Sequence, residues 1–281
     1  MSFKRILTVQ DISCVGQCSL TVALPILSAC GFETGILPSA VLSTHTGGSF
    51  NGSGYTFHDL TEDMPAIAHH WQQVGIRFDA FYTGYLGSAK QIEYVKNICS
   101  ALGKDNARII VDPAMADFGR LYAGFDGDFV QEMAKLCAIA DVILPNITEA
   151  CLLTATPYPE NGYDEAFVDA LLKKLSSLGA KAVVLTGIAF REGENGVMVY
   201  ENGRKQHYTH RLIDRPCHGT GDVYASVFTG CVLRGKSYYD AARIAADFTL
   251  RCIENTVTDT EHWYGVHFEP LLPELMNMLA E

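Results

Sequence analysis

A glycine-rich segment near residue 220 has the residue types and spacing of an anion-binding loop. Gly219, Thr220 and Gly221 are followed at once by Asp222, and then by an apolar stretch long enough for a buried helix. Backbone N–H groups at a helix N-terminus carry partial positive charge, so the segment predicts an anion site. A carboxylate beside a phosphate suits phosphoryl transfer, where it accepts a proton from an attacking hydroxyl. Alternatively, Asp222 caps the helix and the glycines only form a tight turn.

A second glycine-rich segment, residues 230–237, matches the P-loop pattern. A P-loop requires a buried strand before its first glycine, whereas residues 223–228 have the pattern of a helix. We therefore interpret Gly235 as the C-terminal cap of that helix, and Ser237 with Asp240 as the capping box of the next one. This segment is not expected to bind phosphate.

Length and composition restrict the class of protein. The 281 residues are 48% hydrophobic and contain no linker-like stretch, which predicts one large α/β domain spanning 1–281. The sequence has no signal peptide or long apolar run, so we expect a cytoplasmic protein that does not contact membranes. A net charge of −11 argues against a nucleic-acid partner, and a triphosphate substrate would need magnesium as its countercharge. The nine cysteines lack a Cys-x-x-Cys pair, so we expect most of them in the core.

Short apolar runs alternate with helical patterns along the chain. Strands are predicted at residues 6–9, 35–37, 40–42, 78–82, 108–111, 141–144 and 181–185. An antiparallel hairpin follows at 196–200 and 205–208, with Asn202-Gly203 as its turn. Helices are predicted at residues 17–30, 63–74, 88–102, 129–139, 165–178, 222–234, 237–254 and 269–280. The alternation predicts a mostly parallel central sheet with helices on both faces. Residues 43–57 are either a mobile flap over a site or a surface connection.

Polar side chains follow several of the predicted strands. Ligands of parallel sheets bind beyond the carboxyl ends of the strands, and this rule gathers Asp11, Tyr85, Asp112, Asn146, Glu149 and Thr186 at one edge. Asn146 and Glu149 lie three residues apart at the start of a helix and face the same way, as hard oxygen ligands of magnesium would. They could equally form a capping box. Asp117 is either another carboxylate near the metal or a turn residue.

These motifs together resemble those of the ribokinase-type superfamily, and within it the pyridoxal kinases. The resemblance covers nearly the whole chain and rests on Thr44-His45-Thr46-Gly47, Gly84-Tyr85-Leu86-Gly87-Ser88, Asp112-Pro113 with Pro145-Asn146-Ile147-Thr148-Glu149, and Gly219-Thr220-Gly221-Asp222. It implies a single-domain ribokinase-like fold and a homodimer. It also implies ATP-dependent phosphorylation of the 5′-hydroxymethyl group of pyridoxal, pyridoxamine or pyridoxine.

The resemblance further implies roles for individual residues. Asp222 would be the catalytic base, and the loop before it would hold the transferred phosphoryl group. Mg²⁺, and a monovalent cation such as K⁺, would be surrounded by Asp112, Asp117 and Glu149. Asn146 and Thr186 would approach the ATP phosphates, and Gly219, Thr220 and Gly221 would form the anion hole for the transferred group. His45, Thr46 and Tyr85 would line the pocket for the pyridine ring. Residues 115–125 correspond to a flexible lid that excludes water from ATP.

One position departs from the family pattern. The first strand of pyridoxal kinases usually ends in Gln-Ser-His, with the serine near the ring nitrogen of the substrate, whereas this chain has Gln10-Asp11-Ile12. A carboxylate there could pair with a protonated pyridine nitrogen, so Asp11 is expected to affect the choice of vitamer. Cys217, beside the anion loop, either contacts the substrate or is a small buried residue.

Two other functions stay open. Hydroxymethylpyrimidine kinases share the fold and the chemistry, but they commonly have a cysteine at the position of Asp222, which favours a B6 vitamer as the substrate here. A non-catalytic B6-binding protein would not need the base, the metal ligands and the glycine loop together.

Overall fold

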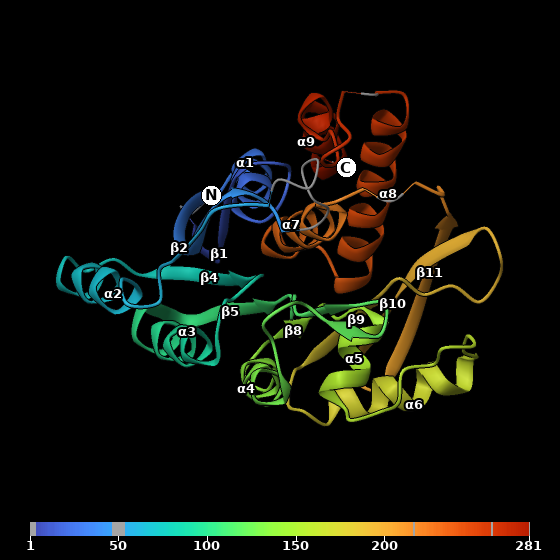
Figure 1. Ribbon diagram of the computed structural model, residues 1–281, viewed down its shortest axis with the longest axis horizontal. Coiled ribbons are helices and arrows are strands. Elements are labelled where there is room, and N and C mark those ends of the chain that lie inside the picture. Colours follow the sequence, from blue (N-terminus) through green and yellow to red (C-terminus); the bar gives the residue numbers. More distant parts are fainter. Residues whose placement is uncertain (1–3, 47–53, 216, 260, 281) are drawn as a thin grey trace.

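A nine-stranded sheet runs through the computed structural model, which describes residues 4–46, 54–215, 217–259 and 261–280. Its strand order is β11-β10-β9-β8-β5-β4-β1-β2-β3 (Figure 1). The strands are β1 (Arg5–Val15), β2 (Glu33–Thr44), β3 (Phe57–Asp59), β4 (Phe78–Thr83), β5 (Gly103–Val111), β8 (Val142–Ile143), β9 (Ala182–Thr186), β10 (Glu194–Glu201) and β11 (Arg204–Arg211). The six neighbouring strands β9, β8, β5, β4, β1 and β2 are parallel to one another. Strand β3 pairs antiparallel with β2, β10 with β9, and β11 with β10. The predicted α/β class is therefore confirmed.

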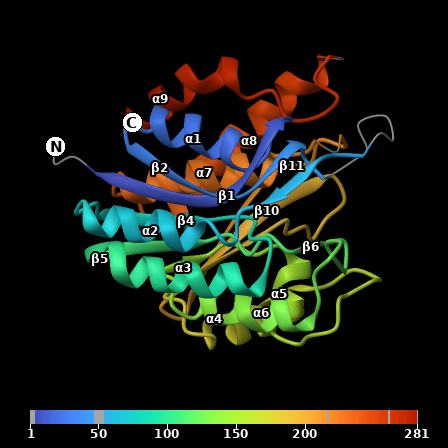
Figure 2. The ribbon, with the colours of Figure 1, turned by 60° about the vertical axis from the view of Figure 1, so that its left-hand side comes forward.

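Helices cover both faces of this sheet (Figure 2). One face carries α2 (Met64–Gln73), α3 (Ala89–Leu102), α4 (Gly127–Cys137), α5 (Ile147–Leu153) and α6 (Glu165–Ser176). The other carries α1 (Leu20–Ala29), α7 (Thr220–Leu233), α8 (Tyr238–Val257) and α9 (Leu272–Ala280), the last preceded by a 3-10 turn at Glu269–Leu271. Successive strand residues point to opposite faces, so Leu7 joins one core and Ile6 the other. The described helices include none long and apolar enough to cross a membrane.

The central helix α7 is buried on nearly all sides, between α1 and α8. Gly230 lies inside it, where an added Cβ would come within 2.3 Å of Cys30 Sγ on the neighbouring segment. Gly235 follows the helix with a φ of 93°, and the Ser237 hydroxyl accepts the N–H of Asp240 at 3.1 Å. Ser237 is the N-cap of α8 as predicted, but both of its contacts with Asp240 run through the Ser237 hydroxyl and not through the backbone N–H that a capping box would use. Gly235 lies one residue beyond the C-cap of α7, which is Arg234. The P-loop reading of this segment is excluded because its first glycine is helical.

The first two strands are longer than their apolar patterns suggest. β1 continues to Val15, and the two predicted runs at 35–37 and 40–42 form the single strand β2 despite Pro38. Gln10 pairs with Pro38 and Ile12 with Val41, so the pairing register shifts at Asp11. Such irregularities redirect side chains near functional sites. The polar residues beyond Val9 are thus held in the sheet rather than in a loop.

Two segments expected to be irregular are partly ordered as strands. Ser43 and Thr44 belong to β2, and Thr56 N–H donates to Ser43 Oγ at 2.9 Å just before β3. Residues 47–53 of the predicted flexible segment 43–57 lie outside the described residues. Within 115–125, β6 (Ala116–Asp117) and β7 (Arg120–Leu121) form a small hairpin that the sequence did not predict.

Candidate active site

A cavity of about 700 Å³ lies where the parallel strands end. It is lined by every residue that the sequence singled out: Asp11, His45, Thr46, Tyr85, Asp112, Asp117, Asn146, Glu149, Thr186, Gly219, Thr220, Gly221 and Asp222. These residues come from positions spread over more than 200 residues of sequence. The predicted convergence at one sheet edge is confirmed.

The anion loop is shaped by one close backbone contact. Gly219 is the N-cap of α7 with a φ of 82°, and a Cβ there would lie 1.7 Å from the carbonyl oxygen of Gln17. Glycine is therefore required by both conformation and space. The first helical hydrogen bond runs from Val223 N–H to Gly219 O, so the N–H groups of 220–222 belong to the first turn, which has no helical acceptor. A Cβ on Gly221 would meet only open space.

Asp222 stands at the third position of α7, directly after the anion loop of residues 219–221. Burial raises the pKa of its carboxyl to about 7, the nearby charge of Asp11 adds to the shift, and a hydrogen bond from the Ser19 backbone opposes it. A carboxylate with such a pKa can accept a proton at neutral pH. The alternative reading of Asp222 as the helix cap is wrong, because Gly219 occupies the cap position and no side chain caps it.

An acidic cluster of Asp112, Asp117 and Glu149 also lines the cavity. Burial, followed by the charges of Glu149 and Asp222, raises the pKa of Asp112 well above its usual range. Burial raises the pKa of Glu149 to about 8, helped by the charge of Asp117. Close carboxylates can shed their repulsion by binding protons or a divalent cation. The donor set is thus oxygen-only and acidic, which fits Mg²⁺.

Asn146 and Glu149 also form the capping box that was left open. Asn146 Oδ1 accepts the N–H of Glu149 at 2.9 Å, and Glu149 Oε2 accepts the N–H of Asn146 at 2.8 Å. Glu149 Oε1 accepts the N–H of Met115 at 3.2 Å. The box fixes the rotamer of Glu149 while its carboxylate still lines the cavity. Capping and cation binding are therefore compatible at this residue.

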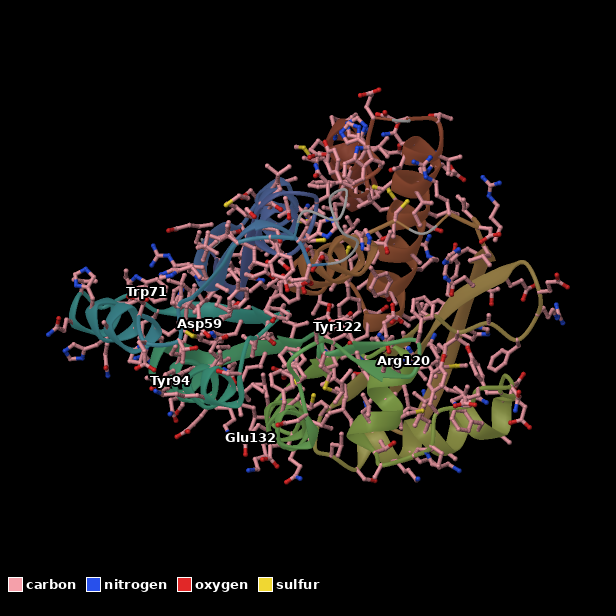
Figure 3. All side chains as sticks on the ribbon, in the orientation of Figure 1. Asp59, Trp71, Tyr94, Arg120, Tyr122 and Glu132 are labelled. Atoms are coloured by element: carbon pink, nitrogen blue, oxygen red, sulfur yellow. The ribbon has the colours of Figure 1, made fainter. Side chains whose placement is uncertain are left out.

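The hairpin of β6 and β7 borders the acidic cluster. Asp117 accepts the N–H of Phe118, and the turn has positive φ at Phe118 (48°) and Gly119 (77°), so Asp117 is a turn residue as well as a cavity residue. Gly119 N–H donates to Thr148 Oγ1 at 3.0 Å, which ties the turn to α5. Figure 3 shows Arg120 on the hairpin and Tyr122 just after it; Tyr122 also lines the cavity.

Another part of the cavity lining, the aromatic wall, combines the buried carboxylate of Asp11 with the aromatic rings of His45 and Tyr85. Asp11 is 5% exposed, accepts the Ser13 hydroxyl at 3.0 Å, and has a pKa raised mainly by burial. The Tyr85 ring stacks on Phe125 at 5.6 Å, and the ring of His45 lies 4.6 Å from that of His218. A planar aromatic ligand with a protonated nitrogen would match this wall.

Several lining residues carried no signal in the sequence. Ser19 has φ 56° and ψ −126°, a conformation that non-glycine residues adopt rarely and at a cost, and its backbone hydrogen-bonds Asp222. His218 and Tyr122 reach the cavity from loops. Cys217, by contrast, was singled out in the sequence; it lines the cavity and is only partly buried, and this burial raises the pKa of its thiol.

Comparisons with known proteins give a consistent set of relatives. The model of the phosphomethylpyrimidine kinase family matches residues 53–267. A Bacteroides thetaiotaomicron protein, provisionally described as a phosphomethylpyrimidine kinase and crystallised with pyridoxal, is 36% identical, with a TM-score of 0.89 over 100% of this chain and 96% of that one. The pyridoxal kinase of Lactobacillus plantarum is 31% identical, with a TM-score of 0.90 over 99% and 98% of the two chains.

A third relative acts on a different substrate class. The hydroxymethylpyrimidine/phosphomethylpyrimidine kinase of Bacillus subtilis is 27% identical over 222 residues, which cover 78% of each chain. The relatives thus include kinases named for a pyridine and kinases named for a pyrimidine.

Proposed function

The chain belongs to the phosphomethylpyrimidine kinase family, a family of kinases, and from that premise we propose that it is a pyridoxal kinase. It transfers the γ-phosphoryl group of ATP to the 5′-hydroxymethyl group of pyridoxal, pyridoxamine or pyridoxine. The observation that carries the proposal is Asp222, a carboxylate with a pKa of about 7 beside the N-terminus of a buried helix, in one cavity with an acidic cluster and an aromatic wall.

The reaction follows from this placement. The vitamer hydroxyl oxygen attacks the γ-phosphorus, the bond from that phosphorus to the β–γ bridging oxygen breaks, and the hydroxyl proton passes to Asp222. Backbone N–H groups of residues 219–221 receive the charge of the transferred phosphoryl group. Asn146 and Thr186 approach the other phosphates of ATP.

Asp112, Asp117 and Glu149 are the residues that would hold magnesium, with potassium as a candidate second cation. The ion would neutralise charge on the ATP phosphates. The hairpin with Tyr122 serves as the lid, since Asp117 of the hairpin and Tyr122 both line the cavity and the nearby Phe125 stacks on Tyr85. We expect a homodimer, as in the family.

Three observations favour a B6 vitamer over a pyrimidine. The base is aspartate rather than the cysteine common in hydroxymethylpyrimidine kinases. Asp11 offers a carboxylate to a protonated ring nitrogen, and the Bacteroides relative was crystallised with pyridoxal. The second candidate, hydroxymethylpyrimidine kinase, is supported by the family model and by the Bacillus subtilis relative.

A product assay separates these functions. Purified protein is incubated with ATP, Mg²⁺ and either each B6 vitamer or hydroxymethylpyrimidine, and ADP release and product mass are followed. We expect vitamer phosphate, formed with a higher kcat/KM than pyrimidine phosphate. A higher kcat/KM for the pyrimidine would favour the second candidate, and vitamer binding without ADP release would indicate a non-catalytic binder.

A further inference from the structure

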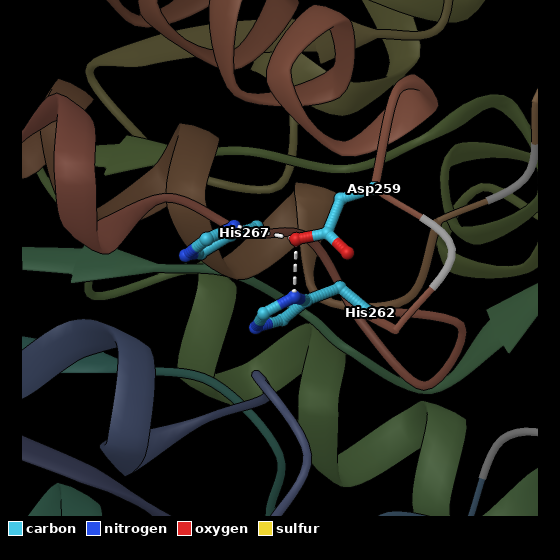
Figure 4. A group of neighbouring side chains, drawn as sticks. All are labelled: Asp259, His262 and His267. Atoms are coloured by element: carbon cyan, nitrogen blue, oxygen red, sulfur yellow. Dashed lines mark hydrogen bonds and ion pairs between the residues drawn. The ribbon is translucent and has the colours of Figure 1, made fainter.

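The loop between α8 and α9 brings two histidines to one carboxylate, outside the cavity described above (Figure 4). Asp259 Oδ2 lies 2.7 Å from Nδ1 of His262 and 3.2 Å from Nδ1 of His267. The two imidazole rings stack in parallel, 3.8 Å apart with 6° between their planes, so both Nδ1 atoms face the same oxygen. The candidate donor atoms all lie within 4.8 Å of one another.

We propose that Asp259, His262 and His267 bind a divalent transition-metal ion, with Zn²⁺ the best match. Two imidazole nitrogens and a carboxylate oxygen are a typical Zn²⁺ donor set, whereas Mg²⁺ prefers oxygen alone. A tetrahedral ion with bonds of about 2.0–2.2 Å separates its ligands by about 3.3–3.5 Å. The present distance of 3.2 Å from His267 Nδ1 to Asp259 Oδ2 nearly matches this separation, whereas the 2.7 Å hydrogen bond between His262 and Asp259 would have to open by about 0.6–0.8 Å to admit the ion. Three protein ligands leave a fourth position for water.

The side chains are accessible enough for an ion to enter and buried enough to hold it. Their exposed fractions are 26% for Asp259, 22% for His262 and 24% for His267. Asp259 Oδ1 accepts the N–H of Glu261 at 2.9 Å, which leaves Oδ2 directed at the histidines.

The backbone around the cluster is fixed by α8. His267 donates its N–H to the buried Thr256 hydroxyl at 2.8 Å, and its carbonyl accepts Asn255 Nδ2 at 3.0 Å. The guanidinium of Arg215 donates to the main-chain carbonyls of Val257 and Asp259. Ligands held by such outer contacts lose little freedom when an ion binds.

The same loop contacts the active site. Tyr264 O lies 2.6 Å from Nε2 of His45, which lines the cavity, and Val266 N–H donates to the carbonyl of His218, next to Gly219. An ion that crosslinks Asp259 to His267 would therefore hold the segment that contacts His45 of the aromatic wall and His218 beside the anion loop. Metal binding itself is a property of the loop and does not depend on the proposed kinase activity.

Cobalt provides a direct test, because Co²⁺ in a low-coordinate nitrogen and oxygen site absorbs visible light through d–d transitions. The full chain is freed of metal with a chelator, then titrated with Co²⁺ in the absence of ATP and vitamer. We expect a visible band that saturates near one equivalent and disappears when Zn²⁺ is added. Calorimetry with Zn²⁺ gives the affinity independently.

Variants assign the ion to its ligands. The double variant His262→Gln, His267→Gln should lose the band, and Asp259→Asn should weaken Zn²⁺ binding at least about 10-fold. The matched control is His69→Gln, His70→Gln, an exposed pair at the end of α2, which should bind as the parent does. Circular dichroism verifies that each variant is folded.

Two results would overturn the proposal. One is a parent protein that binds neither Co²⁺ nor Zn²⁺, which would leave the cluster a hydrogen-bonded brace of the loop. The other is a band that survives the His262 and His267 substitutions or is lost in the His69 and His70 control. Because no nucleotide is present, either result is independent of whether the chain phosphorylates a vitamer.

Discussion

At the level of single residues, Asp222 and Asp11 are two buried carboxyl groups whose pKa values are both raised. Each is desolvated, and the negative charge of Asp11 contributes to the raised pKa of Asp222. A protonated pyridine nitrogen beside Asp11 would remove that repulsion and lower the pKa of the base when the substrate binds. In the proposed reaction, substrate recognition and base strength would therefore be coupled through these two carboxylates.

Replacing Asp11 with asparagine tests this recognition. We expect Asp11→Asn to raise the KM for pyridoxal by about 10-fold or more, because a charge-assisted hydrogen bond contributes roughly 1.5–3 kcal/mol. The KM for ATP should change less, since Asp11 lies on the aromatic wall, where we propose that the vitamer ring binds, and not among the residues proposed to bind the ATP phosphates. Steady-state kinetics with each substrate varied in turn measures both, and equal increases in the two KM values would contradict the assignment.

At the level of elements, the start of α7 is held in place by the segment that follows β1. The carbonyl of Gln17 leaves room for hydrogen only at Gly219, and the Ser19 backbone reaches Asp222 from the same segment. The anion loop is therefore a contact between two distant segments rather than a property of residues 219–222 alone.

Two alanine substitutions test whether the anion loop needs glycine at Gly219, because of its backbone conformation and close contact, but not at Gly221. Gly219→Ala should lower the free energy of unfolding by at least about 2 kcal/mol, because it combines a left-handed backbone with a clash against Gln17 O. Gly221→Ala, with open space around its Cβ, should be neutral or stabilising by up to about 1 kcal/mol. Urea unfolding gives both values, and equal destabilisation would refute this account of the loop.

Features that depend on residues close together in the sequence could be predicted, whereas features that depend on tertiary contacts could not. The cap at Ser237, the turn at Asn202 and Gly203, and the polar residues after the strands are encoded by neighbouring residues, and the structure confirms them. The length of β1 was missed because its second half is polar and is stabilised by pairing with β2. Ser19 and His218 were missed because their positions depend on tertiary contacts, which no short motif records.

For the whole molecule, the buried carboxyl groups of the cavity make the free energy of unfolding depend on pH. The pKa of Glu149 is raised to about 8 from an ordinary value of 4.5, and those of Asp112, Asp222 and Asp11 are raised too. The folded protein therefore keeps protons that the unfolded chain loses as the pH rises. It follows that stability without metal falls between about pH 5 and pH 8.

Magnesium should reverse this loss if it binds the cluster. We expect Mg²⁺ to raise Tm more at pH 8 than at pH 6, and Asp112→Asn to reduce both the pH dependence and the Mg²⁺ effect. Asp105→Asn, an exposed carboxylate on β5, is the control and should behave as the parent. A Tm that is insensitive to Mg²⁺ in the parent at pH 8 would contradict the cation assignment.

The most direct test of the central claim is the kcat of Asp222→Asn with pyridoxal and saturating MgATP. Asparagine keeps the size of the side chain but cannot accept the hydroxyl proton, so we predict a kcat about 10²- to 10⁴-fold lower, with ATP binding nearly unchanged. Asp214→Asn, an exposed carboxylate before the same loop, should keep the parent rate. A kcat for Asp222→Asn within a few-fold of the parent would contradict the role of Asp222 as the base.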